Sequence, residues 1–153
     1  MVIRSVSVRL IKMLVRIAKK IDLDAIVEIE RLAFLDSAFS KRALSYHIVH
    51  NLVLCVEKDN RLVGYMCFSP LTKNKKRRVY SIAVHPAFQG FGVGRVLMEY
   101  GEKKSKAKTI ILEVDENNSR AISLYENLGF EIFGRYDKYY GSSDALRMRK
   151  IIK

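Results

Sequence analysis

The sequence predicts an α/β domain that contains a mixed sheet of about six to seven strands flanked by about four helices. Three observations support this prediction. Apolar runs of strand length alternate with segments in which apolar residues recur at helical spacing. The runs between residues 52 and 84 follow one another closely, as the strands of an antiparallel meander do. The run 109–114 instead follows a helical segment, and a strand–helix–strand unit makes its two strands parallel.

The first half of the chain contains a predicted strand at 15–18, then two helices and three further strands. Asp22 and Ser40 are typical N-cap residues, and the apolar residues after each recur at helical spacing to about residues 33 and 50. The three strands are expected at 52–56, 61–71 and 79–84, with a turn at 59–60, a basic loop at 73–78 and a stop at 85–86.

In the second half, Val93, Leu97 and Tyr100 lie at positions i, i+4 and i+7, which predicts a helix to about residue 104. After the strand 109–114, Ser119 suits the N-cap of a helix that Gly129 ends. Two strands, 131–139 and 145–151, complete the sheet.

The length and charge of the chain bound its class. The 153 residues suit one domain, expected at 13–153, after an N-terminal extension of undetermined role at 1–12, with Met13 as an alternative start to Met1. The net charge of +12 favours anionic partners such as a phosphorylated cofactor, acidic peptides or RNA, and it equally fits solubility or the surface of a thermophilic protein. No apolar run approaches the ~20 residues that span a membrane, so we expect no membrane association.

The cysteines and histidines predict no metal site. Cys55 and Cys67 lie in separate apolar runs, too few and too far apart for a zinc or redox motif, and they are expected to be buried thiols in a reducing cytoplasm. His47, His50 and His85 do not fall at metal-ligand spacing with another ligand type.

The loop Gln89-Gly90-Phe91-Gly92-Val93-Gly94 lies between a predicted strand and a predicted helix. Glycines let backbone N–H groups approach a ligand closely, and the helix N-terminus adds unpaired N–H groups and a positive dipole end, so the loop predicts an anion site. It is not a Walker A loop, because no Gly-Lys-Ser/Thr follows, and its spacing departs from the dinucleotide-binding fingerprint. A structural turn is the alternative interpretation.

Three segments carry a family resemblance. SIAVHPAFQGFGVGRVLMEY resembles the central motif of the GNAT family of N-acetyltransferases, Gln/Arg-x-x-Gly-x-Gly/Ala, which Gln89, Gly92 and Gly94 match. LEVDENNSRAISLYENLGF and RYDKYYGSSDALRM resemble the ribosomal-protein-alanine N-acetyltransferase branch and its archaeal N-terminal acetyltransferase relatives. The resemblance covers roughly residues 15–149 and implies the GNAT fold, with the sheet splayed between two parallel central strands, here 79–84 and 109–114.

The resemblance also implies acetyl-CoA as co-substrate, held in the opening between those strands without a metal. In the family, strand backbone pairs with the pantetheine arm, and the N–H groups of the glycine loop hold the pyrophosphate. The positions that correspond here are Ile82, Ala83, Val84, Gln89, Gly90, Phe91, Gly92, Val93, Gly94, Arg95, Asn118 and Tyr125.

Two residues are candidates for proton transfer. Glu113 is a carboxylate in a run that should be buried, so a charge partner or a function must account for it. A strand-end glutamate that reaches solvent or pairs with an arginine would account for it structurally, whereas the resemblance implies a general base. Tyr125 is a core aromatic by helical position, whereas the resemblance implies a general acid that returns a proton to the leaving thiolate.

By the same resemblance Phe34, Phe39 and Tyr139 line the substrate groove, although Tyr139 is also an ordinary strand aromatic. The branch often has Pro-Trp before the serine that here is Ser40, and this departure leaves the first-residue preference open. The basic run 73–78 is a solvated loop or a contact for ribosomal RNA or an acidic substrate.

The resulting prediction is transfer of an acetyl group to the α-amine of a protein N-terminus in the cytoplasm, by a monomer or a homodimer. An α-amine has a pKa of about 7.7–8.0 against about 10.4 for lysine, so a weak base suffices for it. A lysine or small-molecule amine acceptor is the alternative, and an RNA-binding module without enzymatic activity is the third reading, although no RNA-recognition motif is present.

Overall fold

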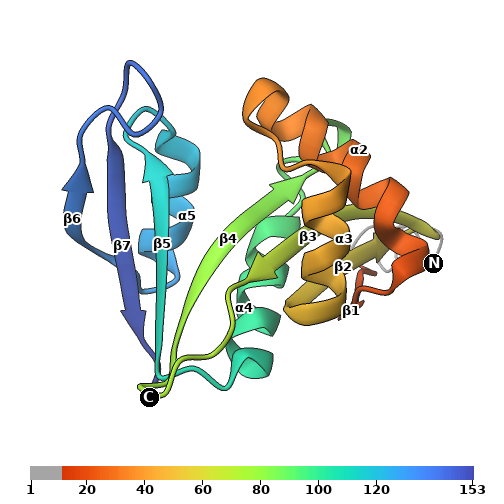
Figure 1. Cartoon of the computed structure of the whole chain (residues 1–153), viewed down its shortest axis with the longest axis horizontal. Helices are drawn as coiled ribbons and strands as arrows, with labels where there is room; N and C mark the ends of the chain where they lie inside the picture. Colours follow the sequence, from red (N-terminus) through yellow and green to blue (C-terminus); the bar gives the residue numbers. More distant parts are fainter. Residues whose placement is uncertain (1–11) are drawn as a thin grey trace, which may run out of the picture. The chain divides into compact units, whose positions relative to one another are not determined.

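The computed structural model describes residues 12–153 and confirms the α/β class (Figure 1). The expectation for residues 1–12 lies, apart from Lys12, outside the described residues. The strands are β1 (Leu14–Ile17), β2 (Leu52–Lys58), β3 (Arg61–Phe68), β4 (Lys76–Val84), β5 (Thr109–Asp115), β6 (Glu131–Tyr136) and β7 (Ala145–Ile151). The α-helices are α2 (Leu23–Phe34), α3 (Lys41–His50), α4 (Val93–Ser105) and α5 (Ser119–Asn127), and 3-10 turns are η1 (Lys20–Asp22), η2 (Leu35–Ser37) and η3 (Pro86–Phe88).

The described strands form a sheet in the order β1-β2-β3-β4-β5-β7-β6. Strands β4 and β5 are parallel, which confirms the predicted central pair, and their ladder covers Lys76–Arg78 and Thr109–Ile111. Strand β7 pairs antiparallel with both β5 and β6, and β1 pairs antiparallel with β2. The sheet is therefore mixed, as predicted. Within residues 12–153, no helix is both long enough and apolar enough to cross a membrane.

The chain divides into two compact units. The first contains the chain up to Cys67 together with Ser81–Gly101, and the second contains Phe68–Tyr80 together with Glu102–Lys153. Strand β4 and helix α4 each contribute residues to both units.

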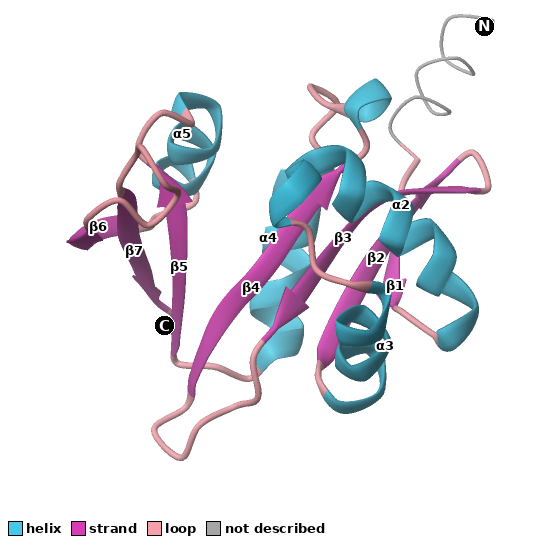
Figure 2. Cartoon of the chain, turned by 45° about the horizontal axis from the view of Figure 1, so that its top comes forward, coloured by secondary structure: helices cyan, strands magenta, loops and turns pink. Residues whose placement is uncertain are grey.

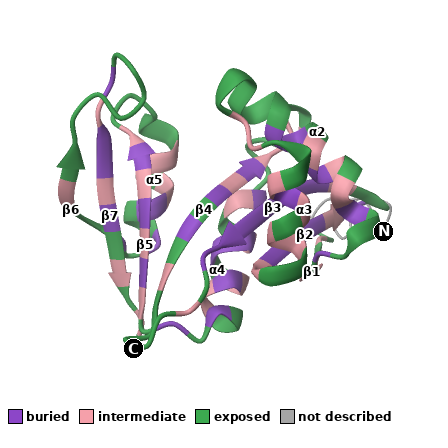
Figure 3. Cartoon of the chain, in the orientation of Figure 1, coloured by how far each residue is buried: buried purple, intermediate pink, exposed green. Residues whose placement is uncertain are grey.

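In the first unit the sheet is covered on both faces, with α2 and α3 on one side and α4 on the other (Figure 2). Strands β2 and β3 are therefore buried almost continuously rather than alternately (Figure 3). Buried residues of α2, of α3 and of the strands that these helices cover form one apolar cluster. Its members are Ala18, Ile26, Ile29, Leu44, Val53, Cys55, Tyr65, Cys67 and Ala83. Burial raises the pKa of the Cys55 thiol to about 11 and that of the Cys67 thiol to about 12, so the predicted burial of both is confirmed.

Gly64 lets strand β3 approach helix α4. A Cβ at this position would lie 2.8 Å from Val93 Cγ1 and 3.2 Å from the Ala83 carbonyl oxygen, and the carbonyl belongs to the sheet backbone. We therefore expect Gly64→Ala to lower the free energy of unfolding by about 1–3 kcal/mol through overpacking. Gly134→Ala is the matched control, because its Cβ would only meet the flexible side chain of Arg147, at 3.4 Å. Urea unfolding of both variants measures the difference, and equal stabilities would show that α4 yields to the extra methyl group.

In the second unit, β5 alternates as a half-buried strand does, with Ile110, Leu112 and Val114 buried and Glu113 on the opposite face. The helix after it does not begin as predicted. Asn118, not Ser119, is the N-cap, and its side-chain oxygen accepts a hydrogen bond from the backbone of the third residue of α5. Ser119 is instead the first helical residue, because an asparagine directly before it already provides the acceptor.

One predicted helix cap and several predicted element boundaries also need correction. The side chain of Asp22 does not cap α2, because its carboxylate is occupied by the Arg16 guanidinium at 2.8 Å and by the Lys19 backbone N–H at 2.7 Å. The predicted basic loop 73–78 ends before Lys76, because pairing with β5 extends β4 over Lys76–Arg78. Strands β3 and β6 end at Phe68 and Tyr136, several residues earlier than the apolar and aromatic pattern predicted.

Candidate functional site

The glycine loop of the first unit joins β4 to α4 through η3. The His85 side chain accepts a hydrogen bond from the Ala87 backbone N–H at 3.1 Å and so caps η3. The Gln89 side-chain amide donates to the Val84 carbonyl oxygen at 3.4 Å, which ties the loop to the end of β4. Gly90 and Gly92 have φ angles of +85° and +81°, a region that side chains with a Cβ rarely occupy.

Gly92 stands directly in front of helix α4. Its carbonyl accepts the first helical hydrogen bond, from the Val96 N–H at 3.1 Å, so the N–H groups of the first turn have no helical partner. A Cβ built on Gly92 would meet no atom within 4 Å, which means that the space beside the loop is open. First-turn N–H groups without a helical partner, a positive helix end and open space beside Gly92 are the features that an anion site requires, and the anion site itself stays a prediction for this loop.

A lysine that sequence reasoning missed lies beside this loop. Lys58, at the end of β2, is 5% exposed, and its ammonium lies 4.4 Å from the centre of the Phe91 ring and 5.6 Å from that of Phe88. The contact with Phe91 is a cation–π interaction, and it places a positive charge against the loop. The turn residues after Lys58 predicted the hairpin but not the direction of the lysine side chain.

In the second unit, Glu113 pairs with Arg78 of β4. The Glu113 side chain is 6% exposed, and the Arg78 guanidinium also contacts the Tyr139 hydroxyl at 3.2 Å. Burial is the largest single influence on the pKa of Arg78 and lowers it, but Glu113 and Tyr139 together outweigh burial, so the pKa of Arg78 is raised. Arg78 thus brings together two predicted site residues, although the sequence placed it in a basic loop.

Arg147 is the cross-strand neighbour of Glu113 on β7. Its guanidinium lies over the Phe133 and Tyr136 rings, at 4.7 and 4.6 Å, and the Tyr136 ring stacks on Tyr139 at 5.6 Å. Within this unit Arg78 is therefore the ion-pair partner of Glu113, and Arg147 is its neighbour across the β5–β7 ladder.

Tyr125 is a buried side chain of α5, 6% exposed, and its ring lies 5.9 Å from that of Phe130. Burial, helped by the neighbouring Tyr140, raises the pKa of Tyr125 to about 12. The hydroxyl therefore stays protonated throughout the neutral range and can donate a proton or a hydrogen bond.

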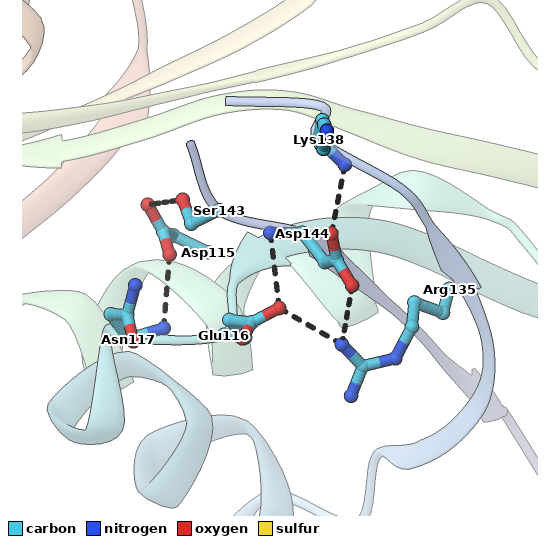
Figure 4. Close-up of polar contacts among 7 residues, drawn as sticks. All are labelled: Asp115, Glu116, Asn117, Arg135, Lys138, Ser143 and Asp144. Carbon is cyan, nitrogen blue, oxygen red and sulfur yellow. Dashed lines mark hydrogen bonds and ion pairs between the residues drawn. The ribbon is translucent and has the colours of Figure 1, made fainter. Parts of the chain in front are cut away.

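A polar network holds the segment 137–144, which carries Tyr139 (Figure 4). The Asp144 carboxylate accepts from the Lys138 backbone N–H and from Arg135, both at 2.8 Å, and Arg135 also donates to Glu116 at 2.9 Å. The Lys138 N–H and Arg135 lower the pKa of Asp144, so the network stays charged at neutral pH. Asp115 adds a second anchor by accepting from the Ser143 hydroxyl at 2.9 Å. Tyr139 thus lies on a braced turn rather than on the strand predicted for it.

The other predicted site residues divide between the units in the same way. Ile82, Ala83 and Val84 form the end of β4 in the first unit. Phe34 is 38% exposed at the end of α2, and Phe39 packs partly buried against the apolar cluster. In the second unit, Asn118 uses its side-chain oxygen to cap α5.

Comparison with known proteins agrees with this geometry. Residues 23–130 match the family model described as "Acetyltransferase (GNAT) family". The N-alpha-acetyltransferase RimI of Mycobacterium tuberculosis is 33% identical over 105 residues, which cover 66% of this chain and 66%, just under two thirds, of that protein. An N-alpha-acetyltransferase of Sulfurisphaera tokodaii is 32% identical over 148 residues, which cover 85% of this chain and 87% of that protein.

The fold has solved counterparts as well. The crystal structure of the ribosomal-protein-S18-alanine N-acetyltransferase from Escherichia coli superposes with a TM-score of 0.84 at 25% identity, and the match covers 93% of this chain and 95% of that chain. The family model spans most of both units, and its residues include the glycine loop, Glu113 and Tyr125. The resemblance predicted from the sequence is confirmed, and the chain belongs to the acetyltransferase (GNAT) family.

Proposed function

We propose that this chain transfers the acetyl group of acetyl-CoA to the α-amine of a protein N-terminus. The observation that carries the proposal is the open, positively polarised loop in front of α4, where Gly90 and Gly92 expose backbone N–H groups to an anion. Lys58 adds a positive charge beside the same loop. The pyrophosphate of coenzyme A is an anion that suits this site, and relatives named N-alpha-acetyltransferase support the choice of acceptor.

In this proposal the residues of the loop, from Gln89 to Arg95, bind the pyrophosphate, and the backbone of Ile82–Val84 pairs with the pantetheine arm. Acetyl-CoA supplies the activated acetyl group and carries the sulfur that leaves. The N–H of Val84 stabilises the charge that develops on the carbonyl oxygen. Asn118 has its side-chain oxygen occupied by the helix cap, so its amide N–H groups are what it offers to the co-substrate.

Two side chains move protons. Glu113 accepts a proton from the attacking ammonium group, directly or through a water, so that the neutral amine forms the new C–N bond. Tyr125 donates its proton to the sulfur as the C–S bond breaks, and the second proton that the acceptor nitrogen loses as the amide forms returns to Tyr125 or passes to solvent. Both residues act in the second unit of the chain.

The ion pair at Glu113 bears on the acceptor. Glu113 is held in an ion pair with Arg78, and the carboxylate of any glutamate is a weak base compared with an amine. An α-amine loses its proton at about pH 7.7–8.0, whereas lysine requires about 10.4. A weak base therefore fits a protein N-terminus better than a lysine side chain.

The basic run 73–78 is less suited to RNA than its composition indicated. Arg77 donates to the carbonyl oxygens of Ser69 and Ser105, both at 2.8 Å, and Arg78 is paired with Glu113. These two cations are committed inside the second unit. The outward-facing cations of the run are Lys73, Lys75 and Lys76, so a contact of the run with RNA or with an acidic substrate rests on these three lysines.

Matched peptides test the proposal. One set has a free Ala, Ser or Met N-terminus, and the other has a blocked N-terminus and one internal lysine. We expect mass spectrometry to find the acetyl group on the free α-amine. Acetyl transfer to lysine alone would establish a different acceptor. If the protein neither transfers acetyl groups nor binds acetyl-CoA, but binds RNA in a salt-dependent way, it is an RNA-binding module without enzymatic activity.

Tyr125→Phe tests the acid. The substitution removes one buried hydroxyl and keeps the ring packed against Phe130, so acetyl-CoA affinity and stability should change little. We expect kcat to fall by about 10²-fold, at the lower end of what general acid catalysis contributes. Stopped-flow or steady-state kinetics with the preferred peptide measures this. A variant with normal kcat would assign Tyr125 to packing alone.

A further inference from the structure

Glu30 is a buried carboxylate that the proposed reaction does not use. It lies on α2 and is 2% exposed. Within residues 12–153, no lysine or arginine nitrogen lies within 4 Å of it. A buried charge without a counter-ion is costly unless several hydrogen bonds replace its hydration. The sequence showed only a glutamate within an amphipathic helix and so did not single it out.

Three donors from three different segments satisfy this carboxylate. The Phe39 backbone N–H donates to Glu30 Oε2 at 2.8 Å, and the Ser81 hydroxyl donates to Oε1 at 2.8 Å. The Tyr65 hydroxyl donates to Oε1 as well. Burial and the Glu30 carboxylate raise the pKa of Tyr65, so this donor keeps its proton at any physiological pH. All these residues belong to the first unit.

Glu30 joins two segments that are candidates for ligand contacts, the one at Phe39 and the one that follows Ser81. Phe39 is a candidate for the substrate groove, and Ser40 after it caps α3 by accepting from the Ala43 N–H at 3.1 Å. Ser81 immediately precedes Ile82–Val84, the part of β4 proposed to hold the pantetheine arm. The Glu30 carboxylate therefore links the backbone at Phe39, a candidate residue of the substrate groove, to Ser81, which directly precedes the part of β4 proposed to hold the pantetheine arm.

The donors around Glu30 require an acceptor at this place. The neighbouring helix positions Ile26 and Ile29 are apolar and fully buried in the apolar cluster. A leucine at position 30 would avoid the desolvation cost of a carboxylate, but it would leave the Tyr65 and Ser81 hydroxyls and the Phe39 N–H without this acceptor. Three directional hydrogen bonds to one side chain also fix distances and angles, which matters where a substrate must be positioned.

We propose that Glu30 is a positioning residue for acetyl transfer, which sets the Phe39 segment relative to the cofactor-binding end of β4 through its hydrogen bonds to Phe39 and Ser81. This inference rests on the proposed function. Its specific consequence is that loss of the carboxylate weakens use of the amine acceptor more than binding of acetyl-CoA.

Glu30→Leu, Glu30→Gln and Ile26→Ala form the test set. Ile26 lies one helical turn before Glu30 in the same cluster, so Ile26→Ala perturbs the core without touching the hydrogen bonds. For Glu30→Leu we expect a rise of about tenfold in the acceptor KM, the size that the loss of one charged hydrogen bond corresponds to, with acetyl-CoA affinity within about twofold of the wild-type value. Glu30→Gln keeps a carbonyl oxygen for the Phe39 N–H, so its acceptor KM should be close to the wild-type value. An equal KM change in Ile26→Ala would reduce Glu30 to a structural role and overturn the inference.

Hydrogen exchange gives a readout that does not depend on acetyl transfer. We expect the Phe39 amide to exchange at least about tenfold faster in Glu30→Leu, while the Leu44 amide, which donates to Ser40 at 3.0 Å within α3, keeps its rate. Should Glu30→Leu fail to fold, Ser81→Ala removes the β4 connection alone and should raise the acceptor KM in the same direction. An unchanged Phe39 rate, or an unchanged acceptor KM in Ser81→Ala, contradicts the inference. Inactivity of the wild-type protein on every α-amine peptide would instead contradict the proposed function.

Discussion

Glu113→Gln is expected to lower kcat by about 10²–10⁴-fold, the range that general base catalysis contributes. The amide keeps the shape of the side chain and can still contact Arg78 and its surroundings, but it cannot accept the proton of the attacking ammonium group. Acetyl-CoA affinity should stay nearly unchanged, because the proposed contacts of the co-substrate lie elsewhere. The loss should therefore reside in kcat rather than in cofactor binding.

A matched control separates chemistry from charge. Glu131→Gln on β6 also removes one carboxylate that is paired with an arginine, here Arg149 of β7 at 3.2 Å. Its side chain is 65% exposed, so we expect kcat within about twofold of the wild-type value, as for most exposed ion pairs. The two variants are compared by steady-state kinetics between about pH 6 and 9, a range that includes the pKa of the α-amine. A Glu113→Gln enzyme with wild-type turnover at every pH excludes Glu113 as the base and leaves its ion pair with Arg78 as its role.

The sequence was informative where a local pattern determines structure. The α/β class, the parallel pair β4 and β5 and the glycine loop follow from periodicity and from Gly90 and Gly92, whose left-handed φ angles only glycine adopts readily. The family resemblance, carried by three short segments, was confirmed over residues 23–130. These features depend on neighbours in the chain, which one sequence displays directly.

The parts that the sequence did not predict depend on partners that are distant in the chain. Arg78 reads as one residue of a basic run, and only the pairing of β4 with β5 brings it to Glu113, 35 positions later. The carboxylate of Glu30 receives donors from positions 39, 65 and 81, and no spacing rule connects them. Asp22 was expected to cap a helix, but Arg16 and Lys19 compete for the same oxygens. Side-chain direction, rather than element type, is what the pattern left open.

Gly92→Val is expected to abolish measurable acetyl-CoA binding, with a loss of affinity of at least about 10²-fold. Two effects add in this variant. A valine at a φ of +81° is strained by about 1–2 kcal/mol, and its side chain occupies the open space beside Gly92, directly before the first turn of α4. Both effects act where the pyrophosphate is proposed to lie.

Gly141→Val separates strain from blockage, because the two glycines share the same φ and the same open space at the Cβ position. Gly141 also has a φ of +81°, and a Cβ there would likewise meet nothing within 4 Å. The two variants should therefore lose similar stability in urea unfolding, whereas only Gly92→Val should lose acetyl-CoA affinity in isothermal titration calorimetry. Equal affinity in both folded variants would place the pyrophosphate away from the loop, and the anion site in front of α4 would then be a structural turn. A selective loss in Gly92→Val, at matched stability, ties co-substrate binding to the space beside this one backbone position.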